Sequence, residues 1–376
     1  MSTPIRVVAI VFVLLLLGFA ALHTGLARHA FFWLFAWVKG VDVVSPTVVR
    51  ELPEDSPYQQ WLERVRGEVP VREGLVIENV HEVALEPWPQ LGEGITGLYL
   101  HFADYQMTDG RIVGIPAGGH TIEQRHLYEK AVYVLQGSGY SLIRQDDTAP
   151  RRFDWKAGDL FSIPLNASHR LHAGPQAARL LLVTDFPLML NLFDDEAFMT
   201  GNPYLFTGRW DGGPGFFDAV DNTEDLAFTT QFVDDVPTTV TQPFDYRGKG
   251  NRSVRWEMAG NTALSMHVSE MPPRMYKKAH RHAGDAFILL LSGEGFSLAW
   301  PEGAYHQRVR IDWRRGTLFV PPTFWYHQHL NTGAEPARYL AINAPSAVRN
   351  MGLRFIDQLE VDIEEIREEW AKAVDR

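Results

Sequence analysis

The stretch FDWKAGDLFSIP, residues 153–164, returns in modified form as IDWRRGTLFVPP at residues 311–322. The two copies share an Asp-Trp pair, a glycine, a Leu-Phe pair and a proline at matching positions, and 158 residues separate their glycines. Upstream, YVLQGSGYSL (133–142) matches LLLSGEGFSL (289–298) at an offset of 156 residues. Two aligned blocks with a nearly constant offset indicate that one structural unit is duplicated.

The repeated unit has the pattern of β structure. From about Glu78 onward, short apolar runs alternate with Gly, Pro, Asn and Asp, which is typical of an all-β sandwich or barrel. Near the end of the chain, VDIEEIREEWAKAV (361–374) places Ile363, Ile366 and Trp370 on one face, so a C-terminal helix is predicted there.

Composition excludes several classes of function. The formal charge is −11, and no basic run offsets it, so the chain lacks the positive footprint of a nucleic-acid-binding protein. The sequence contains no cysteine, which excludes disulfides, thiolate metal sites and cysteine nucleophiles. With 376 residues, of which 45% are hydrophobic, the chain is long enough for one large or two medium domains.

The N-terminus predicts a membrane anchor. Residues 7–27 form an apolar run of 21 residues in which His23 is the one titratable side chain, and about 20 such residues span a bilayer as a helix. The run is longer than the apolar core of a signal peptide, which is the alternative. The aromatic segment AFFWLFAWV (30–38) suits the membrane interface. Arg6 opposes Arg28 and Lys39, so the side of the membrane stays open.

A histidine cluster in the second copy predicts a metal site. His280 and His282 are two residues apart and therefore project from the same face of a strand. His327 follows the second repeat block, on a later strand that can return to them. Three imidazoles on one side of a metal leave positions free for a substrate or oxygen.

These spacings resemble the cupin superfamily, and the duplication resembles a bicupin. The family motifs are G-x5-H-x-H-x3–4-E-x6-G and G-x5-P-x-G-x2-H-x3-N. The second copy departs from them at Arg274, where the first glycine belongs, and at Ala286, where the glutamate belongs. It matches at His280, His282, Gly293, Gly316, Pro322, His327 and Asn331. The resemblance implies two tandem jelly-roll barrels, each a double-stranded β-helix.

The first copy departs further from the motifs. It has Gln124 in place of the first histidine and Lys130 in place of the glutamate. It keeps Gly118, His126, Gly137, Gly158, Pro164 and His169. Two histidines with a Gln or Glu nearby can hold a metal weakly, but a lysine beside a cation is unfavourable. A structural barrel that lost its metal is the favoured interpretation.

Within the superfamily, AHRHAGDAF (279–287) and PPTFWYHQHLNTGAEPA (321–337) resemble the gentisate 1,2-dioxygenase group. In that group the glutamate is also absent and three histidines hold Fe(II), which implies His280, His282 and His327 as ligands. The active copy of the group is the N-terminal one, whereas here the N-terminal copy is degraded. The resemblance implies Fe(II) as the metal, with Mn, Ni, Cu or Zn as alternatives.

Four further residues are candidates for a catalytic role. His329 shares a strand face with His327 and is expected beside the metal ligands. Arg274 is a candidate anchor for a substrate carboxylate, since strand alternation turns Arg281 away from the histidines. Tyr276 and Gln328 are candidate supporting polar groups.

The sequence therefore predicts a membrane-anchored, Fe(II)-dependent bicupin dioxygenase acting on a hydroxylated aromatic or related small molecule. An isomerase or lyase uses the same fold without oxygen. The main alternative is a non-catalytic bicupin, with or without metal, that serves as an accessory subunit of a membrane complex. A homo-oligomer is also compatible with the sequence.

The expected organisation has six parts. They are a membrane anchor with its aromatic segment (1–40), a connector (41–90), barrel 1 with a degenerate site (91–190), a linker with the approach to barrel 2 (191–255), barrel 2 with the three-histidine site (256–345) and a C-terminal helical tail (346–376).

Overall fold

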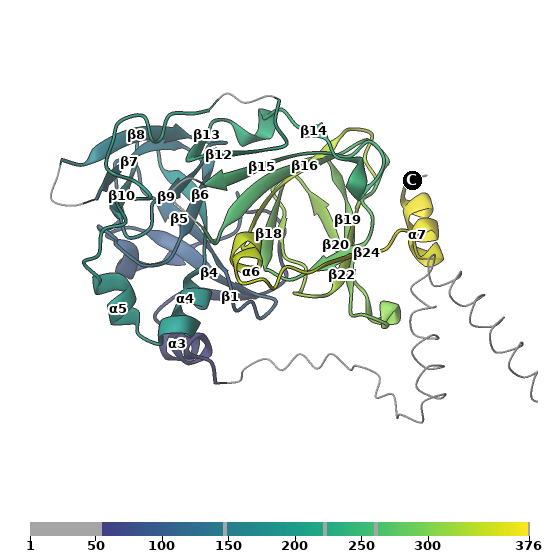
Figure 1. Cartoon of the computed structure of the whole chain (residues 1–376), viewed down its shortest axis with the longest axis horizontal. Coiled ribbons are helices and arrows are strands. Elements are labelled where there is room, and N and C mark those ends of the chain that lie inside the picture. The colour runs from purple at the N-terminus through teal and green to yellow at the C-terminus, as the bar shows by residue number, and fades with distance from the viewer. Residues whose placement is uncertain (1–54, 146–148, 221–223, 259–261, 375–376) are drawn as a thin grey trace, which may run out of the picture. The chain divides into compact units, whose positions relative to one another are not determined.

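The computed structural model describes residues 55–145, 149–220, 224–258 and 262–374, which fold into two consecutive β-barrels (Figure 1). The predicted membrane anchor lies outside these residues. Within the described ranges, no helix is long and apolar enough to cross a bilayer.

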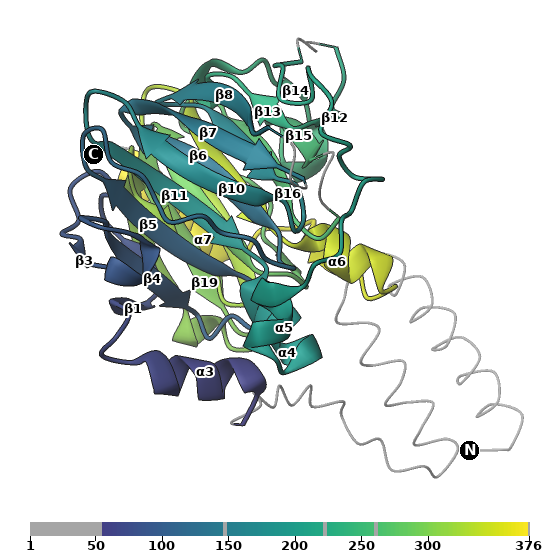
Figure 2. The same ribbon diagram turned by 90° about the vertical axis from the view of Figure 1, so that its left-hand side faces the viewer.

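Barrel 1 is built from two sheets that enclose a core. In the larger sheet, β5, β11 and β6 run side by side, as Figure 2 shows. The larger sheet has the order β1 (Val71–Gly74), β4 (Thr96–Phe102), β5 (Asp109–Ile115), β11 (Ala178–Thr184), β6 (Lys130–Gln136), β9 (Leu160–Ile163) and β13 (Phe232–Val233), with β3 (Glu86–Pro87) beside β4. The smaller sheet has the order β10 (Ser168–Ala173), β7 (Ser138–Arg144) and β8 (Arg151–Lys156).

Barrel 2 repeats this plan. Its larger sheet has the order β12 (Ala227–Thr230), β15 (Arg252–Met258), β16 (Ser265–Met271), β23 (Ala337–Asn343), β18 (Ala286–Ser292), β21 (Leu318–Phe319) and β2 (Val76–Ile77), with β14 (Gln242–Pro243) beside β15. Its smaller sheet has the order β20 (Val309–Arg314), β19 (Glu294–Trp300), β22 (Tyr326–Asn331), β17 (His280–His282) and β24 (Ile356–Gln358). The predicted all-β tandem architecture is confirmed.

The repeated sequence blocks form the turns and the Trp contacts that both barrels share. Gly137 and Gly293 have φ values of 81° and 82°. A Cβ at Gly137 would lie 2.5 Å from the backbone of Ala177, and a Cβ at Gly293 would lie 2.5 Å from the backbone of Ala337. Only glycine adopts this conformation without strain. The indole Nε1 of Trp313 donates to Ser297 Oγ at 2.9 Å, and the matching indole in barrel 1 makes the same bond. Duplicated residues thus make duplicated contacts.

Both barrels also include strands from outside the repeated blocks. The segment 41–90, expected to be a connector, contributes β1 to barrel 1 and β2 to barrel 2, where Val76 pairs with Phe319. The segment 191–255, expected to be a linker and the entry to barrel 2, contributes β12, β14 and β15 to barrel 2 and also β13 to barrel 1. The strands β1, β2 and β13 have only two to four residues, too few to carry a period-2 signal.

Helices cover the ends of the barrels. They are α3 (Pro57–Val65), α4 (Phe186–Phe193), α5 (Glu196–Gly201), α6 (Pro345–Asn350) and α7 (Glu364–Val374), with 3-10 turns η1 (Pro89–Leu91), η2 (Val236–Thr238), η3 (Asp245–Arg247) and η4 (Tyr305–Gln307). The predicted C-terminal helix is α7, and its Ile366 is buried against barrel 2. The tail is not purely helical, because β24 pairs with β17 and places Gln358 opposite His280.

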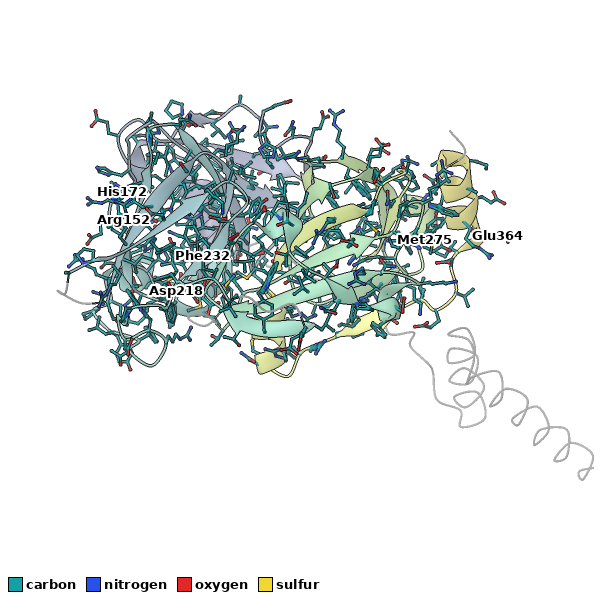
Figure 3. All side chains as sticks on the ribbon, turned by 90° about the horizontal axis from the view of Figure 1, so that it is seen from above. Arg152, His172, Asp218, Phe232, Met275 and Glu364 are labelled. Atoms are coloured by element: carbon teal, nitrogen blue, oxygen red, sulfur yellow. The ribbon has the colours of Figure 1, made fainter. Side chains whose placement is uncertain are left out.

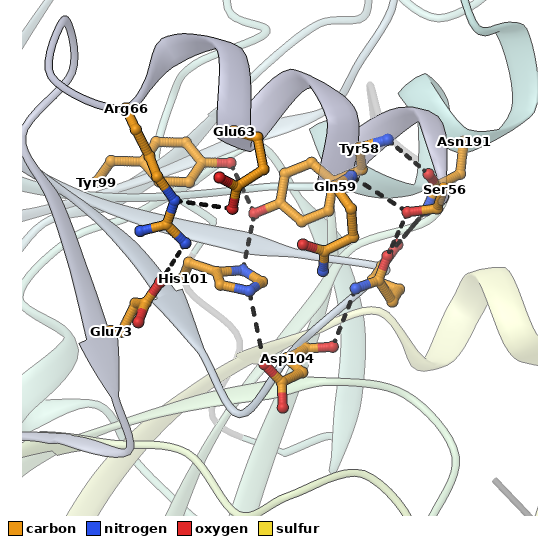
Figure 4. Close-up of polar contacts among 11 residues, drawn as sticks. Ser56, Tyr58, Gln59, Glu63, Arg66, Glu73, Tyr99, His101, Asp104 and Asn191 are labelled. Atoms are coloured by element: carbon orange, nitrogen blue, oxygen red, sulfur yellow. Dashed lines mark hydrogen bonds and ion pairs between the residues drawn. The ribbon is translucent and has the colours of Figure 1, made fainter. Parts of the chain in front are cut away.

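Helix α3 is fixed to barrel 1 by a buried polar network (Figure 4). The side chain of Ser56 accepts a hydrogen bond from the backbone N–H of Gln59, which caps the first turn. The hydroxyl of Tyr58 lies 3.0 Å from the hydroxyl of Tyr99 and 3.1 Å from Nδ1 of His101, both on β4. Burial without a partner would be costly for these groups, so the network sets the position of the helix.

The largest core cluster joins the two barrels. Phe287 on β18 is 1% exposed, and its ring lies 6.3 Å from that of Phe102 and 5.9 Å from that of Tyr105, both in barrel 1. We expect Phe287→Ala to lower the free energy of unfolding by about 3–5 kcal/mol, because a buried phenylalanine leaves a cavity. Urea denaturation monitored by circular dichroism measures this. Phe193→Ala, at a side chain 44% exposed, is the matched control and should change stability by less than about 1 kcal/mol. Equal losses in both variants would contradict a shared core.

Candidate metal centre

Three histidines from two adjacent strands meet inside barrel 2. His280 and His282 lie on β17, and His280 pairs directly with His327 on β22. One ligand nitrogen from each of the three lies within 4.8 Å of the others. Their ring centroids are 4.4 Å (His280–His327), 5.0 Å (His282–His327) and 5.7 Å (His280–His282) apart. The three predicted metal ligands are therefore brought together, in an arrangement that can hold a metal ion.

Backbone carbonyls orient two of these rings. Nδ1 of His280 lies 3.0 Å from the carbonyl oxygen of Lys278, and Nδ1 of His327 lies 3.1 Å from that of Trp325. Each Nδ1 therefore carries the proton and donates it to the carbonyl, which leaves a lone pair on Nε2 for a metal. The three imidazoles, two of them oriented by these backbone carbonyls, fit a divalent metal such as Fe(II), Mn(II) or Zn(II).

Burial keeps these imidazoles neutral. It lowers the pKa of His280 and of His327 well below the usual value, with the neighbouring imidazoles adding to the effect. Burial and the charge of Arg247 lower the pKa of His282 to about 4. A metal ligand must be unprotonated, so the site is ready to bind a cation at neutral pH.

The histidines line one side of a cavity of about 160 Å³. Its wall is the concave face of the larger sheet of barrel 2, where Ser269, His267 and Ala341 come from β16 and β23. Ala286, at the start of β18, also lines it. A glutamate at that position would extend toward the histidines, whereas alanine leaves the space open. The cavity thus owes part of its volume to the motif glutamate that the sequence lacks.

His329 lies where the sequence predicted, beside the ligands. It lines the cavity, and its ring lies 5.5 Å from that of His327. Nδ1 of His329 lies 2.8 Å from the hydroxyl of Ser297, which also accepts the indole N–H of Trp313. The Ser297 hydroxyl can donate to Nδ1 while it accepts the indole N–H, and in that tautomer Nε2 carries the proton.

Arg274, Tyr276 and Gln328, the other three candidates, are not among the residues that line this cavity. Arg274 is exposed, in a turn with φ of 52°, at the position that glycine occupies in the family motif. The hydroxyl of Tyr276 and the amide of Gln328 both donate to Asp362, ahead of α7. Figure 3 labels the neighbouring Met275 on barrel 2 and Glu364 on α7, and the ring of Tyr276 lies 5.2 Å from that of Trp370 on this helix. Strand alternation turns Gln328 away from both flanking histidines.

The sequence missed the cations of the cavity. Lys277 is buried and donates to Ser269 Oγ and to the hydroxyl of Tyr339, both at 2.8 Å. Arg247 in η3 donates to Gln358 Oε1 at 3.0 Å and lines the cavity beside the histidines. The lining also includes Arg255, Arg349 and Arg354. Arg247 lies in the predicted linker and Arg354 in the predicted tail, where no motif pointed to a site.

In barrel 1, a lysine takes the place of a metal. Nζ of Lys130 lies 2.6 Å from Gln124 Oε1 and 2.9 Å from Nε2 of His169. His126 and His169 turn Nδ1 toward backbone carbonyls at 2.8 and 3.0 Å, as the ligands of barrel 2 do. Burial lowers the pKa of Lys130 well below its usual value. Among the described residues, no second group of histidines and carboxylates converges as His280, His282 and His327 do.

The comparisons with known proteins support this architecture. No family model and no curated protein sequence matches the chain. A two-residue deletion mutant of oxalate decarboxylase from Bacillus subtilis superposes on 89% of this chain and 95% of its own, with 13% identity and a TM-score of 0.50. A tryptophan-to-tyrosine variant of the same enzyme also superposes on 89% of this chain and 95% of its own, with 12% identity and a TM-score of 0.51.

The fold is that of a bicupin. This confirms the coarser part of the predicted resemblance. At 12–13% identity the likeness concerns the fold alone, so the gentisate dioxygenase resemblance stays a prediction. A third structure of the same decarboxylase, with 13% identity and a TM-score of 0.50, is described by its Mn(II) centres.

The buried histidines make the metal-free bicupin sensitive to acid. Burial lowers the pKa of His126, His169, His280, His327 and His329 well below that of an unfolded histidine, about 6.5. Below pH 6.5 the unfolded chain therefore binds more protons than the folded one, so stability falls as the pH falls. We expect the Tm of the metal-free protein to drop by about 10 °C or more from pH 7 to pH 5.5. Calorimetry measures it, and a Tm constant over this range would contradict the burial of these rings.

Proposed function

We propose that this chain is a metal-dependent bicupin enzyme, and that it is a dioxygenase acting on a hydroxylated aromatic or related small molecule. The observation that carries the proposal is the set of three neutral imidazoles at an interior cavity, with no carboxylate among the ligands. An enclosed cavity next to open metal positions is what a small-molecule reaction needs.

His280, His282 and His327 would hold the metal. Fe(II) is the proposed ion, and Mn(II), present in the centres of the structurally similar decarboxylase, is the first alternative. Such an ion supplies Lewis acidity and, in the case of Fe(II), reactivity toward oxygen. Three neutral ligands leave its positive charge uncompensated, which favours an anionic substrate.

The remaining residues bind the substrate and move protons. If Ser297 donates to Nδ1, His329 carries its proton on Nε2 and can donate a hydrogen bond to a substrate oxygen. Arg247, beside the ligands, can pair with a substrate carboxylate. Buried walls keep bulk water from the reacting groups.

The test is oxygen uptake. Full-length protein is loaded with Fe(II) without oxygen and then mixed with a panel of hydroxylated aromatic acids in air-saturated buffer. We expect one panel member to consume one equivalent of oxygen per equivalent of substrate, and His327→Ala to lower the rate at least about 100-fold. Arg274→Gln, outside the cavity, is the control and should keep the rate. If the metal-loaded protein consumes no oxygen with any member of the panel, the proposed dioxygenase activity is contradicted.

One observation favours a second candidate function, a non-catalytic accessory subunit. Lys130 fills the site of barrel 1, so half of the duplicated fold has no metal chemistry. Purification of the full chain in mild detergent tests this candidate. Co-purification of a stoichiometric partner protein, together with no oxygen uptake in the assay, would support the accessory subunit. Purification of the chain without a partner would count against it.

We further propose that residues 7–27 anchor the bicupin to a membrane. The support is the length and apolar character of that run. The full chain should stay with membranes in alkaline carbonate, and a variant lacking residues 1–40 should be released. Release of the full chain would contradict the anchor.

A further inference from the structure

The cavity beside the three histidines has an excess of positive charge. Five cationic side chains line it: Lys277, Arg247, Arg255, Arg349 and Arg354. Glu257 is the one acidic residue among the described lining residues. A metal ion at the histidines would add two more positive charges. An interior surface with this balance repels cations and concentrates anions.

Two of these arginines lack protein partners. Arg349 lies 3.5 Å from Glu257 and also contacts Ser346, so it is paired. The guanidinium groups of Arg255 and Arg354 have no hydrogen bond or ion pair within the described part of the chain. Arg255 is nevertheless half-buried, and burial lowers its pKa; the charge of Glu257 opposes this effect, and the charges of Arg354 and Arg349 add to it. A half-buried cation close to two other arginines costs stability unless a ligand compensates it.

The arginines reach the cavity from separate segments of the chain. Arg247 lies next to the metal ligands, and its charge lowers the pKa of His280, His282 and His327. Arg255 lies on β15, between β12 and β16, where its backbone pairs with that of His267. Arg354 precedes β24 on an exposed segment of the tail. Burial lowers the pKa of Arg247, and the charges of Arg255 and Arg354 add to the effect, so the three cations act on one another across the same cavity.

Part of the cavity lining is apolar. Val348, Phe355 and Ile356, contributed by the tail, line the cavity together with Phe244. Such a surface accommodates a ring or a short hydrocarbon segment. The cavity thus combines the three histidines, an apolar surface and several arginines.

We infer that the substrate carries two anionic groups, one directed to the histidines and the other, a carboxylate or a phosphate, bound by Arg255 and Arg354. This inference rests on the proposed function and deepens it by naming the substrate class. Guanidinium groups pair with both anions through two parallel hydrogen bonds, so the shared chemistry is that of an oxyanion.

Binding of matched probes to the full chain tests the inference. The probes are salicylate, with one anionic end; 2-hydroxyterephthalate, with a second carboxylate across the ring; and 2-hydroxy-4-phosphonobenzoate, with a phosphonate in its place. Calorimetric titration of Mn(II)-loaded protein should show at least tenfold tighter binding of one doubly anionic probe than of salicylate. The tighter of the two distinguishes a carboxylate from a phosphate-like group.

Substitutions locate the second anion site. Arg255→Gln with Arg354→Gln should reduce the preference for the doubly anionic probe to less than threefold. The same pair should raise the Tm of ligand-free protein, because it removes two unpaired charges that repel each other. Arg274→Gln, which removes an arginine outside the cavity, should leave both the preference and the Tm unchanged.

The outcomes separate this inference from the proposed function. If salicylate and both doubly anionic probes bind equally while the Mn(II) spectrum responds to all three, the metal site stands and the second anion site is overturned. If the protein holds no metal but the arginine-dependent preference persists, the anion site stands and the metal enzyme is contradicted. A preference unaffected by the double substitution also overturns the inference.

Discussion

Replacing His280 and His282 with alanine should reduce the metal content of the purified bicupin from about one ion per chain to less than about 0.1. Three imidazoles alone hold the ion, because the motif glutamate is replaced by Ala286, so the double variant leaves His327 as a single ligand. One histidine does not hold a first-row metal against buffer and water. Metal analysis after dialysis against a weak chelator measures the loss.

The matched control is His306→Ala. His306 belongs to the same barrel but lies in the exposed η4 turn, outside the cavity. It should keep the full metal content. Circular dichroism shows whether each variant is folded, and the metal-dependent rise in Tm, which follows mass action, should disappear in the double variant alone. If a folded double variant retains one metal ion per chain, the metal binds at a site other than these histidines.

Replacing Lys130 with glutamate and Gln124 with histidine should raise the metal content from about one ion to about two per chain. Barrel 1 already directs the Nε2 atoms of His126 and His169 inward, and its Lys130 amine occupies the space between them. The double substitution removes that amine and supplies a third imidazole and a carboxylate. Four such ligands match the preferences of a divalent first-row metal.

The control for this gain is Lys130→Met. This substitution removes the amine but adds no ligand, so His126 and His169 alone should bind metal weakly. The metal content after dialysis should therefore stay near one ion per chain. His280→Ala combined with the two barrel 1 substitutions should give about one ion, now in barrel 1. A folded double variant that still binds one ion would contradict the view that Lys130 replaces a metal.

The duplicated sequence was sufficient to predict the tandem barrels and the central part of the site. Glycine positions such as Gly293 and the His-x-His spacing are local features, and each leads directly to a turn or to a strand face. The pairing of His280 with His327 follows once both copies are barrels. Those predictions needed no knowledge of segments outside the repeat.

The remaining features depend on long-range contacts. Arg274 was expected at the substrate, but the backbone keeps the positive φ that the motif glycine has, and this directs the arginine into an exposed turn. Arg247 and Arg354 reach the cavity from the linker and the tail, whose short elements carry no periodic pattern. The exchange of β2 and β13 between barrels arises from pairing across the interface, which no local sequence signal encodes.

The most direct test of the metal centre is a diffraction experiment on crystals of the Fe(II)- or Mn(II)-loaded bicupin, with data collected on both sides of the absorption edge of the metal. The account predicts one anomalous peak per chain, within coordination distance of His280, His282 and His327, and none beside Lys130. The absence of a peak among the three histidines, or a peak in barrel 1, would contradict it.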